Sequence, residues 1–215
     1  MVNFIAVKKF LVIGIIALNM FSCACMQGSS MHNHHQVACH SRSKNVFLTM
    51  MDTMMRNMDT AKTGISPDFD FMSQMIPHHQ GAIGMAEYEI ENGRNFLMVQ
   101  LAKSILAEQA VEIQQMQYYK NLFLPVDYPF KDEFKKEMNE TMDLMMRNLP
   151  DHELIDVDTA FAMVMMPHHQ AGIDMAKVVL KFSSDNKTIG LSKQIIASQE
   201  VEIQQMSSFL KKRYE

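Results

Sequence analysis

Two stretches of this chain share one motif: MIPHHQGAIGMA at residues 75–86 and MMPHHQAGIDMA at residues 165–176. Each copy places Pro-His-His-Gln between two methionines. The flanking sequence repeats as well, because MMRN precedes and EIQQM follows both motifs. This duplication predicts two similar structural units within the 215 residues.

The spacing of apolar residues predicts helices in both copies. One helix face consists of methionines at i, i+3, i+4 and i+7: Met51, Met54, Met55 and Met58. The corresponding helix of the second repeat has five residues on one face: Met138, Met142, Met145, Met146 and Leu149. A second helix opens at the N-cap candidate Asp68 or Asp158 and carries the motif, and a third follows it. No stretch alternates with period two, so a sheet is not expected.

The fold predicted from these helices is all-α. The last two helices of each repeat form a hairpin that cannot bury its apolar stripe alone, so two hairpins together form a four-helix bundle with additional Met-rich helices beside it. The predicted organisation is a signal peptide at 1–22, a flexible tether containing His and Met at 23–45, a first repeat at 46–123, a connecting loop at 124–135 and a second repeat at 136–215.

The N-terminus has the features of a secretory signal. Lys8 and Lys9 precede an apolar run at 10–21, which is shorter than the roughly 20 residues of a membrane-spanning helix. Ser22 and Cys23 resemble the cleavage site of bacterial lipoproteins, which predicts lipidation at Cys23 and a place on the periplasmic face of a membrane through a lipid anchor only. A retained membrane anchor and a soluble periplasmic protein are the alternatives.

Composition restricts the functional classes. Removing residues 1–22 leaves 18 basic against 24 acidic residues, and this acidic balance gives no indication of nucleic-acid binding. Methionine is abundant, at 23 residues, and it serves either as a flexible core filler or as a soft thioether ligand. The tether adds four candidate auxiliary ligands: His32, His34, His35 and His40.

The duplicated motif points to a metal site. Pro77 and Pro167 either kink a helix or begin a new one, and both readings leave backbone groups without helical partners beside the histidines. Imidazole and thioether together form a ligand set for copper, especially Cu(I), whereas buried histidines satisfied within the core are the alternative. The candidate ligands are Met75, His78, His79 and Met85 in the first repeat and Met165, His168, His169 and Met175 in the second.

The third helix of each repeat carries a matching polar stripe. Gln109, Glu112 and Met116 share one face, as do Gln199, Glu202 and Met206. If these faces meet the histidines, each glutamate accepts an imidazole N–H, the glutamines assist, and Met116 and Met206 are auxiliary ligands. A solvated surface stripe is the alternative.

The motifs resemble those of the DUF305 family, a ferritin-like group of bacterial proteins. The resemblance rests on Asp-x-x-Phe before Met-x-Pro-His-His-Gln, on Ile-x-Met-Ala after it and on Gln-x-x-Glu-Ile-x-x-Met later, and it extends from about Phe47 to Tyr214. It implies a helical bundle, export to the periplasm, and copper or silver binding through Met and His. Ala160 and Val164 stand where the first repeat has Asp70 and Gln74, which leaves open whether the two sites bind equally.

These observations predict a binding protein and not an enzyme. It would take Cu(I), with Ag(I) as the other candidate, and sequester it or pass it to a copper efflux or chaperone protein. A ferritin-like di-metal oxidase is one alternative, but Met75 and Met165 stand where its Glu-x-x-His motif needs a carboxylate. A Met-rich periplasmic interaction protein is the other alternative.

Overall fold

The computed structural model describes residues 45–126, 128–149 and 156–215. Within these ranges there are no strands, so the all-α prediction is confirmed. Six helices follow one another: α1 (Val46–Asp59), α2 (Pro67–Asn92), α3 (Phe96–Lys120), α4 (Lys131–Arg147), α5 (Val157–Phe182) and α6 (Asn186–Tyr214). The predicted signal peptide, Cys23 and all of the tether except Asn45 lie outside the described residues.

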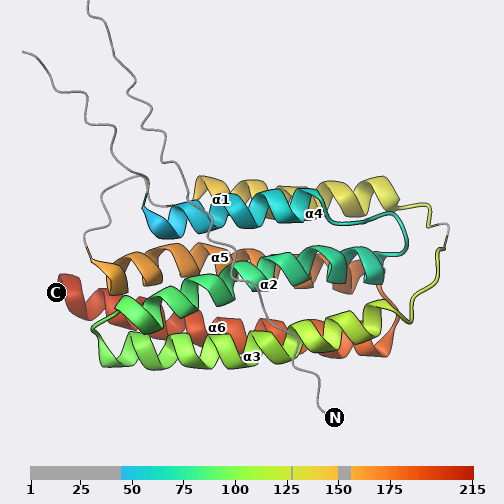
Figure 1. Ribbon diagram of the computed structural model, residues 1–215. Helices are drawn as coiled ribbons and strands as arrows, with labels where there is room; N and C mark the ends of the chain where they lie inside the picture. Colours follow the sequence, from blue (N-terminus) through green and yellow to red (C-terminus); the bar gives the residue numbers. More distant parts are fainter. Residues whose placement is uncertain (1–44, 127, 150–155) are drawn as a thin grey trace, which may run out of the picture. The chain divides into compact units, whose positions relative to one another are not determined.

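The helices lie in three layers (Figure 1). Helices α2 and α3 form one hairpin and α5 and α6 the other, and contacts of α2 with α5 and of α3 with α6 close the predicted four-helix bundle. Helix α1 packs on α2 and helix α4 packs on α5. The Met-rich helices therefore cover the α2/α5 side of the bundle, and α3 and α6 form its other side.

The two repeats are related by an approximate two-fold axis. Helices α2 and α5 run side by side in opposite directions (Figure 1). Their motifs lie near the middle of each helix, so the two Pro-His-His-Gln segments meet at the axis. Residues that precede the motif in one repeat therefore lie toward the same end of the bundle as residues that follow it in the other.

Side-chain caps begin the two central helices. The Ser66 hydroxyl accepts a hydrogen bond of 3.1 Å from the Phe69 N–H, and the Asp156 carboxylate accepts one of 3.0 Å from the Thr159 N–H. The predicted N-caps, Asp68 and Asp158, were therefore placed too late. Both lie inside the first helical turn, where a carboxylate faces the positive end of the helix dipole.

Pro77 and Pro167 lie inside continuous helices. The hypothesis that each proline begins a new helix is therefore wrong. Because proline has no N–H, the carbonyls of Ser73 and Met163 lose their usual helical donor one turn later.

The connection between the repeats differs from the predicted loop at 124–135. Helix α3 ends at Lys120 and α4 begins at Lys131, so the end of the predicted loop is helical. Asp132 and Glu133 lie in the first turn of α4, where acidic side chains favour a helix start.

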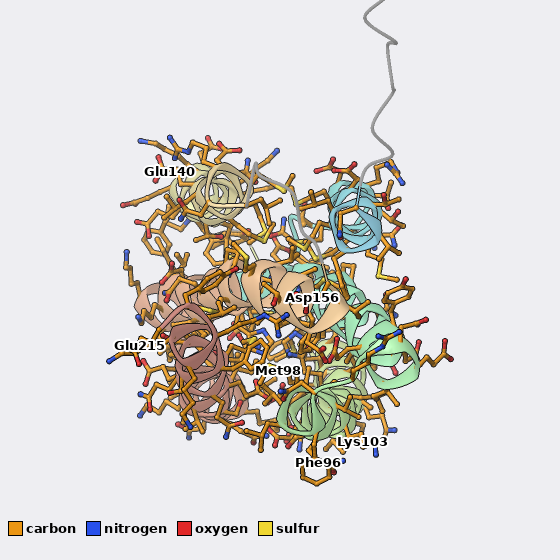
Figure 2. The ribbon with its side chains drawn as sticks, turned by 90° about the vertical axis from the view of Figure 1, so that its left-hand side faces the viewer. Phe96, Met98, Lys103, Glu140, Asp156 and Glu215 are labelled. Atoms are coloured by element: carbon orange, nitrogen blue, oxygen red, sulfur yellow. The ribbon has the colours of Figure 1, made fainter. Side chains whose placement is uncertain are left out.

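The methionine faces of α1 and α4 form part of the hydrophobic core. Sulfur atoms lie between these helices and the α2/α5 layer in Figure 2. The buried set comprises Met51, Met54 and Met58 on α1 and Met138, Met142 and Met145 on α4. Burying a side chain of this size stabilises the folded state by about 1.5–3 kcal/mol. The buried methionines therefore hold α1 and α4 against the bundle.

No helix in the described part of the chain combines the length and the apolar character needed to cross a membrane.

Candidate metal centre

The four motif histidines form one cluster in the middle of the bundle. All four have no exposed surface. The rings of His78 and His168 stack with centroids 3.8 Å apart and planes 29° apart. His79 and His169 lie beside this stack, with centroids 6.1 Å from His78 and 5.8 Å from His168 respectively. The sequence suggested one histidine pair per repeat, and the structure brings both pairs together at the two-fold axis.

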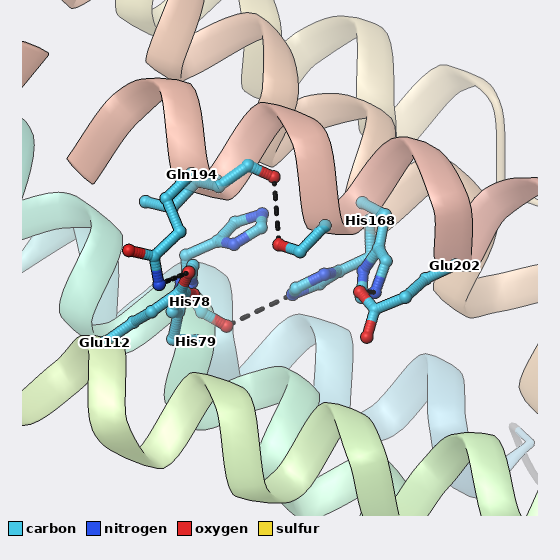
Figure 3. Close-up of polar contacts among 9 residues, drawn as sticks. His78, His79, Glu112, His168, Gln194 and Glu202 are labelled. Carbon is cyan, nitrogen blue, oxygen red and sulfur yellow. Dashed lines mark hydrogen bonds and ion pairs between the residues drawn. The ribbon is translucent and has the colours of Figure 1, made fainter. Parts of the chain in front are cut away.

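Each outer histidine faces a buried glutamate from the third helix of its own repeat (Figure 3). The Nε2 atom of His79 lies 2.9 Å from Oε2 of Glu112, and the Nε2 atom of His169 lies 2.8 Å from Oε2 of Glu202. The first contact has hydrogen-bond geometry. The second is short but poorly aligned. The stripes on α3 and α6 therefore face the bundle interior, and their interpretation as solvated surface is wrong.

These contacts determine where the imidazole protons lie. A carboxylate or carbonyl oxygen can only accept, so a facing nitrogen must carry the hydrogen. Nε2 of His79 faces Glu112, and Nε2 of His168 donates to the carbonyl of His78 over 3.1 Å (Figure 3). In His168, whose pKa burial holds well below its ordinary value, Nδ1 then carries a free lone pair, the form that binds metals.

The Nδ1 atoms of all four histidines are buried without a hydrogen-bond partner in the described structure. Nε2 of His78 is also unpartnered. A buried polar atom without a partner destabilises the folded state by about 1–3 kcal/mol. The cluster is therefore unfavourable as a purely structural element.

The central pair of histidines is neutral. Burial is the main cause that holds the pKa of His78 and of His168 well below the ordinary value of 6.5. Repulsion from neighbouring imidazoles acts in the same direction. Neutral rings keep their lone pairs available without a proton having to leave first.

Buried amides lie on the same helices as Glu112 and Glu202. Gln109 and Gln199 are 2% and 1% exposed, and no described residue hydrogen-bonds to either side chain. Gln194, which the sequence analysis did not identify, donates to Oε1 of Glu112 over 3.3 Å (Figure 3). It lies on α6, so it connects the second repeat to the carboxylate of the first. A single glutamine on a helix carries no sequence signal for such a role.

The predicted methionine ligands are all buried in the bundle core. Met75, Met85, Met165 and Met175 have no exposed surface, and the same holds for Met116 and Met206. Met75 and Met85 occupy one continuous helix, whose rise of about 1.5 Å per residue separates them by roughly 15 Å along its axis. One ion cannot contact both sulfur atoms, so the methionines of a repeat must serve different positions.

A further buried acid, Glu89, lies toward one end of the bundle. It has no exposed surface, and desolvation together with the neighbouring carboxyl of Asp158 raises its pKa to about 9. Asp158 accepts the backbone N–H groups of Arg94 at 2.9 Å and Asn95 at 2.7 Å, which fixes the α2–α3 turn to α5. Sequence reasoning missed Glu89, although it follows Met85 by four residues on the same buried stripe.

Within residues 45–126, 128–149 and 156–215, no group of three His, Cys, Asp or Glu side chains is arranged to hold one metal ion. These residue types therefore supply fewer than three ligands to any one ion in this region, and thioether sulfur is the other soft donor buried in the core.

Comparison with known families identifies the repeats. The model of the family described as "Domain of unknown function (DUF305)" matches residues 24–120 and again 129–212. The chain belongs to the DUF305 family. The two matches correspond to the two helical repeats, so this DUF305 protein contains the domain twice. A comparison with curated protein sequences gives no match.

Several solved structures share this arrangement of helices. The silver-soaked form of CopM is 29% identical, with a TM-score of 0.53, and the similarity covers 69% of this chain and 97% of CopM. The Cu(I)-bound form of CopM is 27% identical with the same TM-score, covering 69% of this chain and 98% of CopM. A DUF305 fragment from Deinococcus radiodurans, at 22% identity and a TM-score of 0.51, covers 71% of this chain and 98% of its own and supports the fold alone.

The remaining predicted site residues lie outside the described structure. These are the tether ligands His32, His34, His35 and His40 and the lipidation site Cys23. Their roles stay predictions.

Proposed function

We propose that this DUF305 protein binds Cu(I), and Ag(I) as a close chemical analogue, at the histidine cluster. It acts outside the cytoplasm, where it sequesters copper or passes it to an efflux or chaperone protein. The predicted signal and lipoprotein site support this location. We propose a carrier rather than an enzyme, because capture and release of an ion involve no chemical conversion of a substrate.

One observation carries the proposal: four buried imidazole Nδ1 atoms have no partner in the described structure. Two opposed lone pairs, or one lone pair and a thioether, suit a monovalent soft ion. Bound metal would offset the unfavourable burial of these atoms. CopM, whose structures include silver-bound and Cu(I)-bound forms, supports the choice of metal.

The geometry also suggests how the glutamates assist binding. Glu112 fixes the ring orientation of His79 through Nε2 and directs Nδ1 elsewhere, and Glu202 lies in the same position beside His169. Such partners of ligating histidines typically change metal affinity by about 10- to 100-fold. The candidate sulfur donors are Met75, Met85, Met165 and Met175, together with Met116 and Met206.

A di-metal oxidase is the second candidate, since each hairpin supplies a His–Glu pair to one bundle core. Ferritin-like oxidases use four carboxylates and two histidines. Here the cluster has four histidines and two glutamates, and Met75 and Met165 stand where carboxylates are needed. The balance of ligands favours a soft monovalent ion.

Metal-dependent stability distinguishes a ligand role from a structural one. We expect Cu(I), added anaerobically, to raise the melting temperature of the parent protein by mass action. The His78→Ala/His79→Ala and His168→Ala/His169→Ala variants should each lose much of this increase, and the variant with all four changes should lose more than either. Met75→Leu and Met165→Leu, which nearly keep volume, test the sulfur donors in the same assay.

The matched control is Gln80→Ala/Gln170→Ala, which alters the exposed residue next to each histidine pair. This variant should respond to Cu(I) like the parent. If the variant without the four histidines is still stabilised to the same extent, the histidine cluster does not bind copper. Destabilisation that is equal with and without metal would show that the histidines are structural.

A further inference from the structure

A cavity of about 420 Å³ lies where the C-terminal end of α1 meets α4. Three methionines from these two helices line it: Met55 and Met58 from α1 and Met142 from α4. Gln74 of α2 contributes an amide. No histidine is among the described residues that line this cavity, so it is distinct from the histidine cluster.

The charges around the cavity favour a cation. Asp59 and Asp143 line it, against one cationic side chain, Lys135. Helix α1 ends at Asp59, so the cavity also faces the negative end of its dipole. Soft sulfur donors inside and negative charge at the entrance together suit a soft cation rather than an anion or an apolar ligand.

The second repeat shows that helix packing does not by itself require the thioether of Met58 or the amide of Gln74. In the alignment of the shared MMRN segments, Leu149 corresponds to Met58. In the alignment of the Pro-His-His-Gln motifs, Val164 corresponds to Gln74. Hydrocarbon side chains therefore stand in place of Met58 and Gln74 in the second repeat, whereas Met55 and Met142 correspond to methionines, Met146 and Met51.

We propose that this cavity is a second soft-metal site, which binds one monovalent Cu(I) or Ag(I) ion through the thioethers of Met55, Met58 and Met142. The choice of metal rests on the function proposed above, whereas the location of the site does not. Met55 is half-buried and the acidic residues are exposed, so this ion is closer to solvent than any ion at the fully buried histidines. It therefore exchanges faster.

Silver binding to the full chain tests the site directly. Ag(I), added as the nitrate in chloride-free buffer, is counted by equilibrium dialysis with elemental analysis, and methionine methyl signals are followed by NMR. The Met55→Leu/Met58→Leu/Met142→Leu variant should bind one ion fewer than the parent. In the parent, the methyl signals of these three residues should shift on silver addition.

The control variant is Met51→Leu/Met54→Leu/Met145→Leu. It changes the same number of methionines on each of the two helices, at buried positions that do not line the cavity. It should keep the full number of ions. If the triple variant does not fold, the single Met58→Leu, which copies Leu149, should lower silver affinity at this site at least tenfold.

The two proposals fail in different ways. If the cavity variants and the parent bind equal numbers of ions and the three methyl signals do not shift, this site does not exist, whatever the histidines do. The variant lacking the four histidines should still bind the cavity ion. If it keeps every ion while the cavity variant loses one, the cavity binds metal and the histidine cluster does not.

Discussion

The two repeats have the same central histidine–glutamate pairs but differ in the residues around them. In both, a buried His-His pair on the second helix lies beside a buried glutamate on the third. The surroundings are unequal, because Glu112 also accepts a hydrogen bond from Gln194 and Oε1 of Glu202 has no partner in the described structure. The residue corresponding to Gln194 is Ser104, whose hydroxyl bonds to Glu108 instead. The two repeats therefore share the same donors but differ in how firmly each carboxylate is held.

A second difference lies where each repeat enters its central helix. In the first repeat, buried Asp70 accepts the N–H of Gly64 at 2.7 Å, the N–H of Ile65 at 3.0 Å and the hydroxyl of Tyr128 at 2.7 Å. Gly64 adopts a φ of 88°, a conformation that favours glycine. Asp70 thus connects the turn before α2 to the segment between the repeats. In the second repeat the residue is Ala160, which has no carboxylate.

The largest effect should come from making the repeats alike at this position. Asp70→Ala leaves three donors without their acceptor, so we expect a loss of about 3 kcal/mol in the free energy of unfolding, measured by chemical denaturation. Glu91→Ala, at an exposed acid on the same helix, should change it by less than about 0.5 kcal/mol. Equal effects of the two variants would show that Asp70 does not stabilise this connection.

The ends of the two central helices differ in a pair of residues. In the first repeat Glu89 is followed four residues later by Gly93, and in the second Val179 is followed by Ser183. A Cβ atom at Gly93 would clash with Oε1 of Glu89 and would lie 2.6 Å from its backbone oxygen. Glycine therefore makes room for the buried glutamate, whereas serine is compatible with valine. The Ser183 hydroxyl in turn donates to Asp68.

A double-mutant cycle measures whether Glu89 and Gly93 are energetically coupled. Gly93→Ser alone should destabilise the protein by about 2 kcal/mol through overpacking. Glu89→Val/Gly93→Ser, which copies the second repeat, should recover more than half of that loss. The turn can then relax from a φ of −67° toward the −92° of Ser183. Additive effects would contradict the proposed pairing of these two positions, since coupled neighbours give non-additive free energies.

The third expected effect is a change in the pH dependence of stability. Native Glu89 keeps its proton up to about pH 9, whereas the unfolded chain releases it near 4.5. Between these values the unfolded state binds fewer protons, so stability falls as pH rises, by up to about 1.4 kcal/mol per pH unit. Glu89→Gln should remove this contribution and flatten the curve of unfolding free energy against pH between 5 and 9.

Exposed Glu91→Gln provides the control, because it alters the same helix without touching a buried acid. Its curve should follow that of the parent. A Glu89→Gln curve as steep as the parent's would mean that Glu89 is ionised in the folded protein.

The sequence predicted the local features well because they depend on periodicity. Methionines at helical spacing predicted the faces that α1 and α4 bury, and the repeated Glu-x-x-x-Met stripes predicted the carboxylates that face His79 and His169. The caps at Ser66 and Asp156 were misplaced because Asp68 and Asp158 are equally good capping residues by type. Glu89 was missed because a glutamate on a helix is normally exposed, and only its neighbours make it buried and protonated.

Three features of this protein follow from its sequence without a structure: the two repeats of three helices, the histidines and methionines that are candidate ligands, and the soft donors that replace the carboxylates of a hard-metal bundle. These follow from residue type and spacing along a helix of known pitch. Only the tertiary structure decided that the two histidine pairs meet and stack. The same holds for Gln194, which reaches Glu112 from the other repeat, and for the three methionines around one cavity between α1 and α4. Each of these depends on the antiparallel packing of helices far apart in the chain, and periodicity within one helix carries no information about which helix lies opposite.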